Sequence, residues 1–187
     1  MADTTFTLRA ASSLGGANIA IGDNNIVERT ELALVSVAIP LDGEEKLSEA
    51  MHKAWGLPIP KPRLSLVKDE MRALSTAPDQ LLLIFPHTTP DAEAFIQKKL
   101  AGAGYTTDQT DVWTVLEISG PDVIASLERL CPLDAPGMPI NGSARTVMEH
   151  MGAMIVRTAP DGFLLLSASS SARSFLHAVE TSLRYCQ

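Results

Sequence analysis

Cysteine is scarce in this chain of 187 residues: Cys131 and Cys186 are the only two. Two cysteines are too few for a disulfide framework, and neither has the paired spacing of a zinc site. The histidines are scattered singly, with no second histidine or cysteine three or four residues away. They are His52, His87, His150 and His177. The sequence therefore predicts reduced thiols and no metal site.

Positive charge and long apolar runs are also in short supply. The formal net charge is −7, and the sequence has local basic clusters such as Lys61, Arg63 and Lys68 but no basic stripe with interleaved aromatic residues. This argues against a nucleic-acid partner. No apolar run approaches the length of a membrane span, and the first residues lack the pattern of a signal peptide. We therefore expect a cytoplasmic chain without a membrane partner.

Catalytic motifs are missing as well. Neither a Gly-x-Ser-x-Gly elbow nor a P-loop is present. Gly102-Ala-Gly104 follows a predicted helix and lacks the third glycine of a dinucleotide fingerprint. Glu149 and His150 resemble an acid/base pair, but adjacent residues on a strand point to opposite faces. No catalytic residue is predicted.

A repeated segment is the most informative feature that the sequence does contain. Ala77-Pro78-Asp79 leads into Leu81-Leu82-Leu83, and Ala159-Pro160-Asp161, 82 residues later, leads into Leu164-Leu165-Leu166. A turn followed by an apolar strand thus recurs at nearly half the length of the chain. This recurrence predicts two similar structural units.

Each unit is predicted to run strand, helix, strand, strand, helix. Asp42 is expected to cap the first helix and Gly56 to end it. In the first unit the predicted elements are Leu32–Ile39, Glu44–Trp55, Arg63–Leu74, Gln80–Phe85 and Asp91–Leu100. In the second they are Val112–Ser119, Asp122–Leu130, Gly152–Thr158, Phe163–Ser167 and Ala172–Arg184.

This order predicts an α+β fold with antiparallel or mixed sheets and helices packed on one face. We expect an extended N-terminal arm over residues 1–30, a first unit over 31–104 and a second over 105–187. The arm either docks on a partner or folds back on its own body. The proline-rich stretch at 57–63 is either a contact surface or a plain connector. One compact body and two small domains both remain open.

Possible ligand-binding residues are few. Hydroxyl groups at Ser167–Ser171 lie between a predicted strand and helix, where they either hold an anion or cap the helix. Glu149, Arg157 and Ser169 are the candidates for a small-molecule pocket between the two units.

The second unit resembles a known family. The segments concerned are 108–122, 127–134, 145–152 and 163–177, and they resemble the gamma subunit of heterotetrameric sarcosine oxidase over most of residues 105–185. Ser119-Gly120-Pro121-Asp122 is also similar to the folate-binding aminomethyltransferases, the T-proteins of the glycine cleavage system. The T-protein pattern continues with a Gly-Gly-x-x-Asp-Asp segment that carries its catalytic aspartate. Here Gly152–Thr158 contains no carboxylate.

The resemblance implies the aminomethyltransferase fold and a place in a four-subunit enzyme. That enzyme demethylates sarcosine to glycine, forms hydrogen peroxide and transfers the one-carbon unit to tetrahydrofolate. FAD, FMN, NAD and tetrahydrofolate belong to the assembly, and the partners of this chain would be the alpha, beta and delta subunits. We expect an accessory, structural subunit that binds no cofactor alone. The alternative is a stand-alone module that binds folate or another small molecule.

Overall fold

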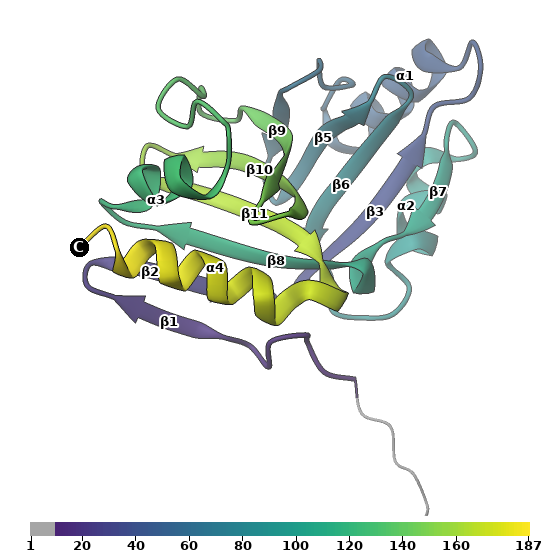
Figure 1. Cartoon of the computed structure of the whole chain (residues 1–187). Coiled ribbons are helices and arrows are strands. Elements are labelled where there is room, and N and C mark those ends of the chain that lie inside the picture. The colour runs from purple at the N-terminus through teal and green to yellow at the C-terminus, as the bar shows by residue number, and fades with distance from the viewer. Residues whose placement is uncertain (1–9) are drawn as a thin grey trace, which may run out of the picture.

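The computed structural model of this protein describes residues 10–187, whose strands form two sheets (Figure 1). Sheet A is six-stranded, in the order β1 (Asn18–Ile21), β2 (Asn24–Glu28), β8 (Trp113–Ser119), β11 (Gly162–Ala168), β10 (Met151–Ala159) and β9 (Ser143–Met148). Sheet B is five-stranded, in the order β4 (Ser65–Lys68), β5 (Met71–Ala77), β6 (Gln80–Pro86), β3 (Leu32–Ala38) and β7 (Tyr105–Asp108). Every strand pair is antiparallel.

Helices cover the outer face of each sheet (Figure 1). Sheet A carries α3 (Val123–Leu130) and α4 (Ala172–Arg184), and sheet B carries α1 (Glu44–Trp55) and α2 (Ala92–Leu100). Short 3-10 turns at Thr110–Val112 and Ser169–Ser171 precede β8 and α4. The predicted α+β fold, with helices on one face of each sheet, is confirmed. Within residues 10–187, no helix is both long and apolar enough to cross a membrane.

The repeated Ala-Pro-Asp segments are two copies of the same bulged hairpin turn. In the first copy Ala77 pairs with Gln80 and the register shifts between Ser75 and Ala77; in the second copy Ala159 pairs with Gly162 and the shift lies between Arg157 and Ala159. Proline at the first turn position supplies the φ angle that such a turn requires. The repetition therefore extends to the position of the β-bulge.

The leucine runs after these turns are apolar throughout because both faces of their strands are buried. On β6, Leu81 and Leu83 pack under α1 and α2, whereas Leu82 faces sheet A. On β11, Leu165 packs under α3 and α4, whereas Leu164 and Leu166 face sheet B. The inner faces of the two sheets thus share one hydrophobic core.

Each sheet includes a strand that lies directly before the first predicted strand of the other unit. β2 directly precedes β3 in the chain but pairs with β8, and β7 directly precedes β8 but pairs with β3. The division at residues 104 and 105 stays a prediction, but the strand exchange shows that the two sheets are not independent of one another.

The N-terminal segment differs from the expected extended arm. Residues 18–28 form the hairpin β1–β2 at the edge of sheet A, which corresponds to the alternative of a strand folded back on its own body. Ile26 is fully buried in the core under α3 and α4. Residues 1–9 of the predicted arm lie outside the described residues.

A buried carboxylate fixes the segment that precedes this hairpin. Glu28 is only 7% exposed and accepts hydrogen bonds from the backbone N–H of Leu14 at 3.0 Å and of Gly16 at 2.7 Å. The hydroxyls of Ser12 and Ser13 also donate to it, at 2.9 and 3.4 Å. Glu28 therefore holds residues 12–16 against sheet A.

We expect Glu28→Ala to lower the free energy of unfolding by about 3 kcal/mol, because donors around it lose their acceptor. Glu28→Gln, which keeps one side-chain oxygen, should cost about half as much. Urea unfolding followed by circular dichroism measures both changes, with the exposed Glu45→Ala as control. Equal midpoints for Glu28→Ala and the control would contradict the prediction.

A second anchor joins the hairpin to α3. Asn24 is fully buried, and its side-chain oxygen accepts the backbone N–H of Asp122 at 2.9 Å. Its amide nitrogen donates to the Asp122 carboxylate at 2.9 Å and to the carbonyl of Ile21 at 3.1 Å. The Ser-Gly-Pro-Asp motif therefore contains the contact between the β1–β2 turn and the start of α3.

Several sequence predictions need correction. Arg63–Leu74 is not one strand but β4 and β5 joined by the turn at Asp69 and Glu70, and β7 and β9 were missed. Glu149 and His150 are not on a strand; they form the two-residue turn between β9 and β10, with φ angles of 44° and 68°. Such turns usually contain asparagine or glycine, so the sequence carried no signal for this one.

Helix ends were predicted with mixed success. Gly56 ends α1 in the left-handed conformation, as expected. The N-cap is Gly43 rather than Asp42, whose side chain makes no cap hydrogen bond because Asp42 lies in the preceding turn with φ 58°.

Candidate functional site

The two units meet where the segments before β4 and β9 run antiparallel to each other. Leu64 and Gly142 form an isolated β-bridge. The N–H of Ser65 donates to the carbonyl of Asn141 at 2.7 Å, and the N–H of Ser143 donates to the carbonyl of Arg63 at 2.9 Å. This junction is a hydrogen-bonded contact between the two units, and Ser65 and Ser143 are buried in it.

Arg72 of β5 supports the junction from the inner face of sheet B. Its guanidinium donates to Ser65 Oγ at 2.7 Å and to Asn141 Oδ1 at 3.0 Å. Burial lowers the pKa of Arg72 from its ordinary value. Because both acceptors are neutral, the role of this arginine is to tie the first unit to the turn before β9.

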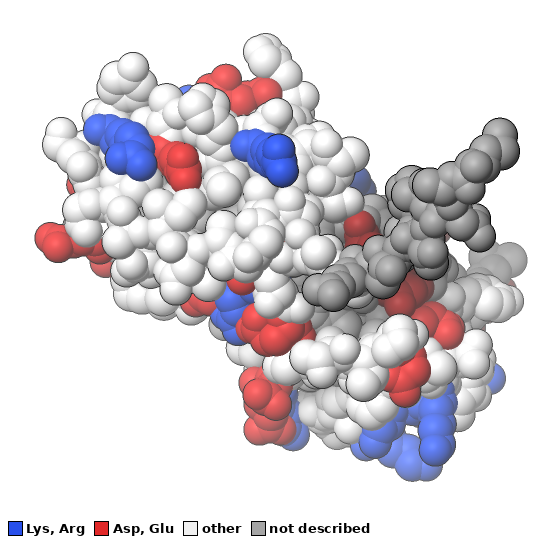
Figure 2. All heavy atoms as spheres, turned by 90° about the horizontal axis from the view of Figure 1, so that it is seen from below, with Lys and Arg blue, Asp and Glu red and all other residues white. Residues whose placement is uncertain are grey.

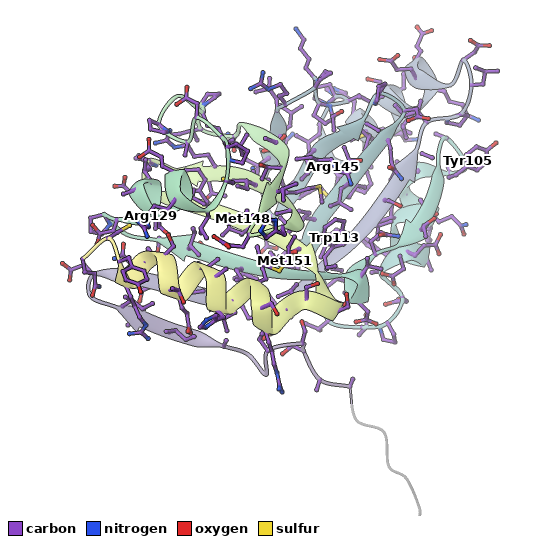
Figure 3. The ribbon with its side chains drawn as sticks, in the orientation of Figure 1. Tyr105, Trp113, Arg129, Arg145, Met148 and Met151 are labelled. Atoms are coloured by element: carbon purple, nitrogen blue, oxygen red, sulfur yellow. The ribbon has the colours of Figure 1, made fainter. Side chains whose placement is uncertain are left out.

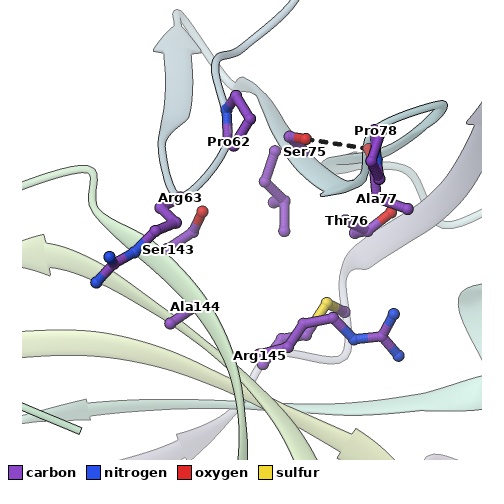
Figure 4. Close-up of a pocket in the computed structure, with 11 residues that line it drawn as sticks. Pro62, Arg63, Ser75, Thr76, Ala77, Pro78, Ser143, Ala144 and Arg145 are labelled. Carbon is purple, nitrogen blue, oxygen red and sulfur yellow. Dashed lines mark hydrogen bonds between the residues drawn. The ribbon is translucent and has the colours of Figure 1, made fainter.

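A cleft of about 250 Å³ opens beside the junction, between the end of β5 and the start of β9 (Figure 4). Leu74, Ala144 and Met154 give it an apolar lining. The hydroxyl of Ser75 is directed to its own turn and donates to the carbonyl of Ala77 at 3.2 Å. The interior of the cleft is therefore mainly a surface for apolar contact.

Two arginines stand at the rim of this cleft. Arg63 and Arg145 are both exposed, and their guanidinium groups point away from each other in Figure 4. A carboxylate or phosphate at the rim could pair with either group. Because the groups diverge, the arrangement does not form one bidentate anion site.

The three residues singled out from the sequence do not come together. Glu149 is exposed in the turn before β10, and Arg157 lies near the far end of that strand. About eight residues of extended chain, or about 25 Å, separate them. Ser169 follows β11, and its hydroxyl donates to the carbonyl of Asp111 at 2.7 Å. None of the three lines the cleft beside the junction.

Arg157 has a structural task. Its guanidinium contacts five backbone carbonyl oxygens at 2.6–3.4 Å and stacks over the ring of Phe163. The carbonyls belong to Ala135, Pro136, Met138, Ala159 and Pro160. These contacts occupy its donors and hold the loop between α3 and β9 against the end of β10.

We expect Arg157→Met to loosen that loop. The methionine retains an apolar contact but leaves the carbonyls without their donor, which should cost about 2 kcal/mol. Hydrogen exchange read by mass spectrometry should then rise at least about tenfold in residues 131–142, which corresponds to about 1.4 kcal/mol of local stability. Arg145→Met, at an exposed position, serves as the control. Unchanged exchange in the loop would show that Arg157 does not organise it.

Arg72, Asn141, Ser143 and Arg145 were not selected from the sequence. Their meeting depends on β4 and β9, which are among the strands that the sequence did not reveal. Among the residues that the structure describes, no group of three histidine, cysteine or acidic side chains is placed to hold a metal ion. Cys131 lies in the core, and its burial raises the pKa of the thiol. The thiol is therefore protonated at neutral pH.

No protein-family model matches this sequence, and no curated protein matches it either. The fold is similar to a chain of the heterotetrameric sarcosine oxidase from Corynebacterium sp. U-96, solved in complex with pyrrole 2-carboxylate. The TM-score is 0.75 with 19% identity, and the match covers 90% of this chain and 88% of that one.

The fold is also similar to the glycine cleavage system aminomethyltransferase T from Bartonella henselae. Here the TM-score is 0.66 with 16% identity, and the match covers 84% of this chain but only 45% of the transferase. This chain therefore spans about half the length of the transferase. The likeness to both proteins, first drawn from residues of the second unit, is confirmed for the fold of nearly the whole chain.

Proposed function

We propose that this chain is the accessory gamma subunit of a heterotetrameric sarcosine oxidase. One observation carries the proposal: the match to a chain of that enzyme covers 90% of this chain and 88% of the other. The aminomethyltransferase is matched over only 45% of its length. The correspondence in length thus favours the subunit of the oxidase over a complete transferase.

The strand that would carry the transferase aspartate supports this choice. Residues of β10 pack into the two cores: Ile155 lies under α3 and α4, and Met154 and Val156 face sheet B. The side chains of β10 therefore pack sheet A against its helices on one face and against sheet B on the other. Methylene transfer of the T-protein type would need a carboxylate in the segment that this strand contains.

In the proposed assembly the alpha, beta and delta subunits are the partners, and they would carry FAD, FMN, NAD and tetrahydrofolate. Our proposal gives this chain no cofactor of its own. Its contribution would be a rigid surface on which the larger subunits assemble.

A folate-binding or other small-molecule module is the second candidate, favoured by the arginine-rimmed cleft between the units. The cleft measures about 250 Å³. Pockets that enclose drug-sized ligands have volumes of about 300–1,000 Å³, so this cleft would hold only part of a folate molecule, such as one carboxylate with its neighbouring carbons. The accessory role is therefore the better supported of the two.

Co-expression with the other three subunits encoded in the same genome tests the proposal. We expect this chain to co-purify with them in equal amounts, and we expect sarcosine-dependent formation of hydrogen peroxide in the purified complex. A complex of full activity that excludes the chain would overturn the proposal. Calorimetry of the isolated chain with tetrahydrofolate tests the second candidate, and we expect no heat of binding at millimolar ligand.

A further inference from the structure

A groove of about 800 Å³ runs between α1 and α2 on the outer side of sheet B. Each helix lines it with one stripe of residues, spaced three and four apart. The lining residues of the two helices are Lys46, Glu49, Ala50, Lys53, Ala54, Phe95, Lys98, Lys99 and Leu100. We call these residues the basic groove.

The basic groove is positive in a protein of net negative charge. It contains four lysines against one carboxylate, Glu49, whereas the whole chain has a formal net charge of −7. All four lysines are exposed. In Figure 2 a group of basic side chains lies at the lower right edge, and other basic and acidic side chains are scattered over the rest of the face.

Helix dipoles do not account for the whole cluster. Lys53, Lys98 and Lys99 occupy the last turns of their helices, where a cation is favoured. Lys46 lies in the first turn of α1, where a cation is disfavoured. Its place in the groove needs another explanation, and an anionic occupant supplies one.

Exposed apolar side chains lie at one end of the same surface. Leu41 is 95% exposed and Tyr105 is 70% exposed. Tyr105 pairs with Ala38, three residues before Leu41, so both side chains belong to the same end of β3. Gly104 packs close to Leu47 of α1, which brings this end of the surface against the helix. Figure 3 shows Tyr105 at the outer edge of the molecule, beside β7.

We propose that the basic groove, with Leu41 and Tyr105 at its end, docks an acidic amphipathic segment of a partner subunit. This inference rests on the proposed function. Apolar side chains of the segment would contact Ala50, Ala54 and Tyr105. Tyrosine is a residue type enriched in binding hot spots. Its carboxylates would meet the four ammonium groups. The formal net charge of −7 opposes the approach of the whole chain to nucleic acid or to an anionic membrane, which favours a protein partner.

The test uses the full chain and the co-expressed alpha, beta and delta subunits. The groove variant is Lys46→Glu, Lys53→Glu and Lys98→Glu. The matched control is Lys68→Glu, Arg173→Glu and Arg184→Glu, which changes the net charge equally at exposed positions. We expect the groove variant to bind the other subunits at least about tenfold more weakly, and the control to bind within about twofold of the unchanged chain.

A neutral variant guards against a loss of fold. Leu41→Ser with Tyr105→Ser changes only exposed side chains, and it should weaken assembly while circular dichroism stays native. For the unchanged chain, assembly should weaken as salt rises from about 0.05 M to about 0.5 M, since exposed charges are screened over shorter distances.

The outcomes separate the two proposals. If the unchanged chain does not assemble with the other subunits, the proposed function is wrong, and so is the proposed docking of a partner subunit in the basic groove. If the unchanged chain assembles and the groove variant does so equally well, the function stands and the docking surface is wrong. Lysine-dependent binding to vesicles with phosphatidylserine or to duplex DNA, with assembly unaffected, would also overturn the docking surface.

Discussion

Gly120→Ala is expected to lower the free energy of unfolding by about 4 kcal/mol, from backbone strain and overpacking together. Gly120 has a φ angle of 134°, a conformation that side chains rarely adopt. A Cβ atom there would lie 2.5 Å from Asn24 Oδ1, 2.6 Å from Asn24 Cα and 2.7 Å from the carbonyl oxygen of Asp23. Two of these three atoms are backbone, so a rotamer change cannot relieve the overlap.

The consequences of this substitution should reach the β1–β2 turn. Relief of the overlap requires the turn to move away from α3, which breaks the hydrogen bonds between Asn24 and Asp122. Gly152→Ala is the matched control, because a Cβ there meets nothing within 4 Å. Urea unfolding measures both variants. A loss below about 1 kcal/mol for Gly120→Ala would show that the turn adapts easily.

This result bears on the Ser-Gly-Pro-Asp motif, which carried part of the resemblance to aminomethyltransferases. In this chain the motif has a mechanical role. Because Gly120 has no side chain, the β1–β2 turn can pack against it. The backbone N–H of Asp122 donates a hydrogen bond to the side-chain oxygen of Asn24 at the end of this turn. A motif shared with an enzyme can thus be retained for the packing of the fold.

The parts of the fold that could be predicted from the sequence are those with a strong local signal. The leucine runs after Pro78 and Pro160 predicted strands because apolar residues fill both faces. Apolar residues at a spacing of three and four predicted the helices α1 and α4, because they form one buried face on each. Short edge strands gave no such signal: two of the four residues of β4 are exposed, and β9 ends in a turn without glycine.

The candidate surfaces could not be predicted because they depend on pairs of distant segments. Lys46 and Lys98 are far apart in the sequence, and only the packing of α1 beside α2 brings them to one groove. In the same way Arg72 meets Asn141 only because β5 lies beside the start of β9. The sequence alone therefore singled out neither these residues nor their contacts.

The exchange of strands suggests why the two units stay together. β2, which leads directly into the first unit, pairs in sheet A, and β7 of the second unit pairs in sheet B. The inner faces of the two sheets bury apolar residues between them. Separation of the units would expose this core and break the pairing of β2 with β8 and of β7 with β3. Unfolding of one unit should therefore unfold the other.

Leu166→Ala tests this coupling. Leu166 of β11 is fully buried in the core between the sheets, so its truncation should cost about 3 kcal/mol. With a urea dependence of about 2 kcal/mol per molar, the unfolding midpoint should fall by about 1.5 M. Val147→Ala, at a half-exposed position of β9, is the control and should shift the midpoint little.

Two tryptophans report on the two units separately. Trp55 packs against the core under α1 and α2, whereas Trp113 borders the core between the sheets. Trp113→Phe leaves Trp55 as the reporter, and Trp55→Phe leaves Trp113. In each background, Leu166→Ala should shift the fluorescence midpoint by the same amount, because the mutated layer belongs to both units. A shift seen by Trp113 but not by Trp55 would mean that the units unfold separately and that the chain comprises two domains.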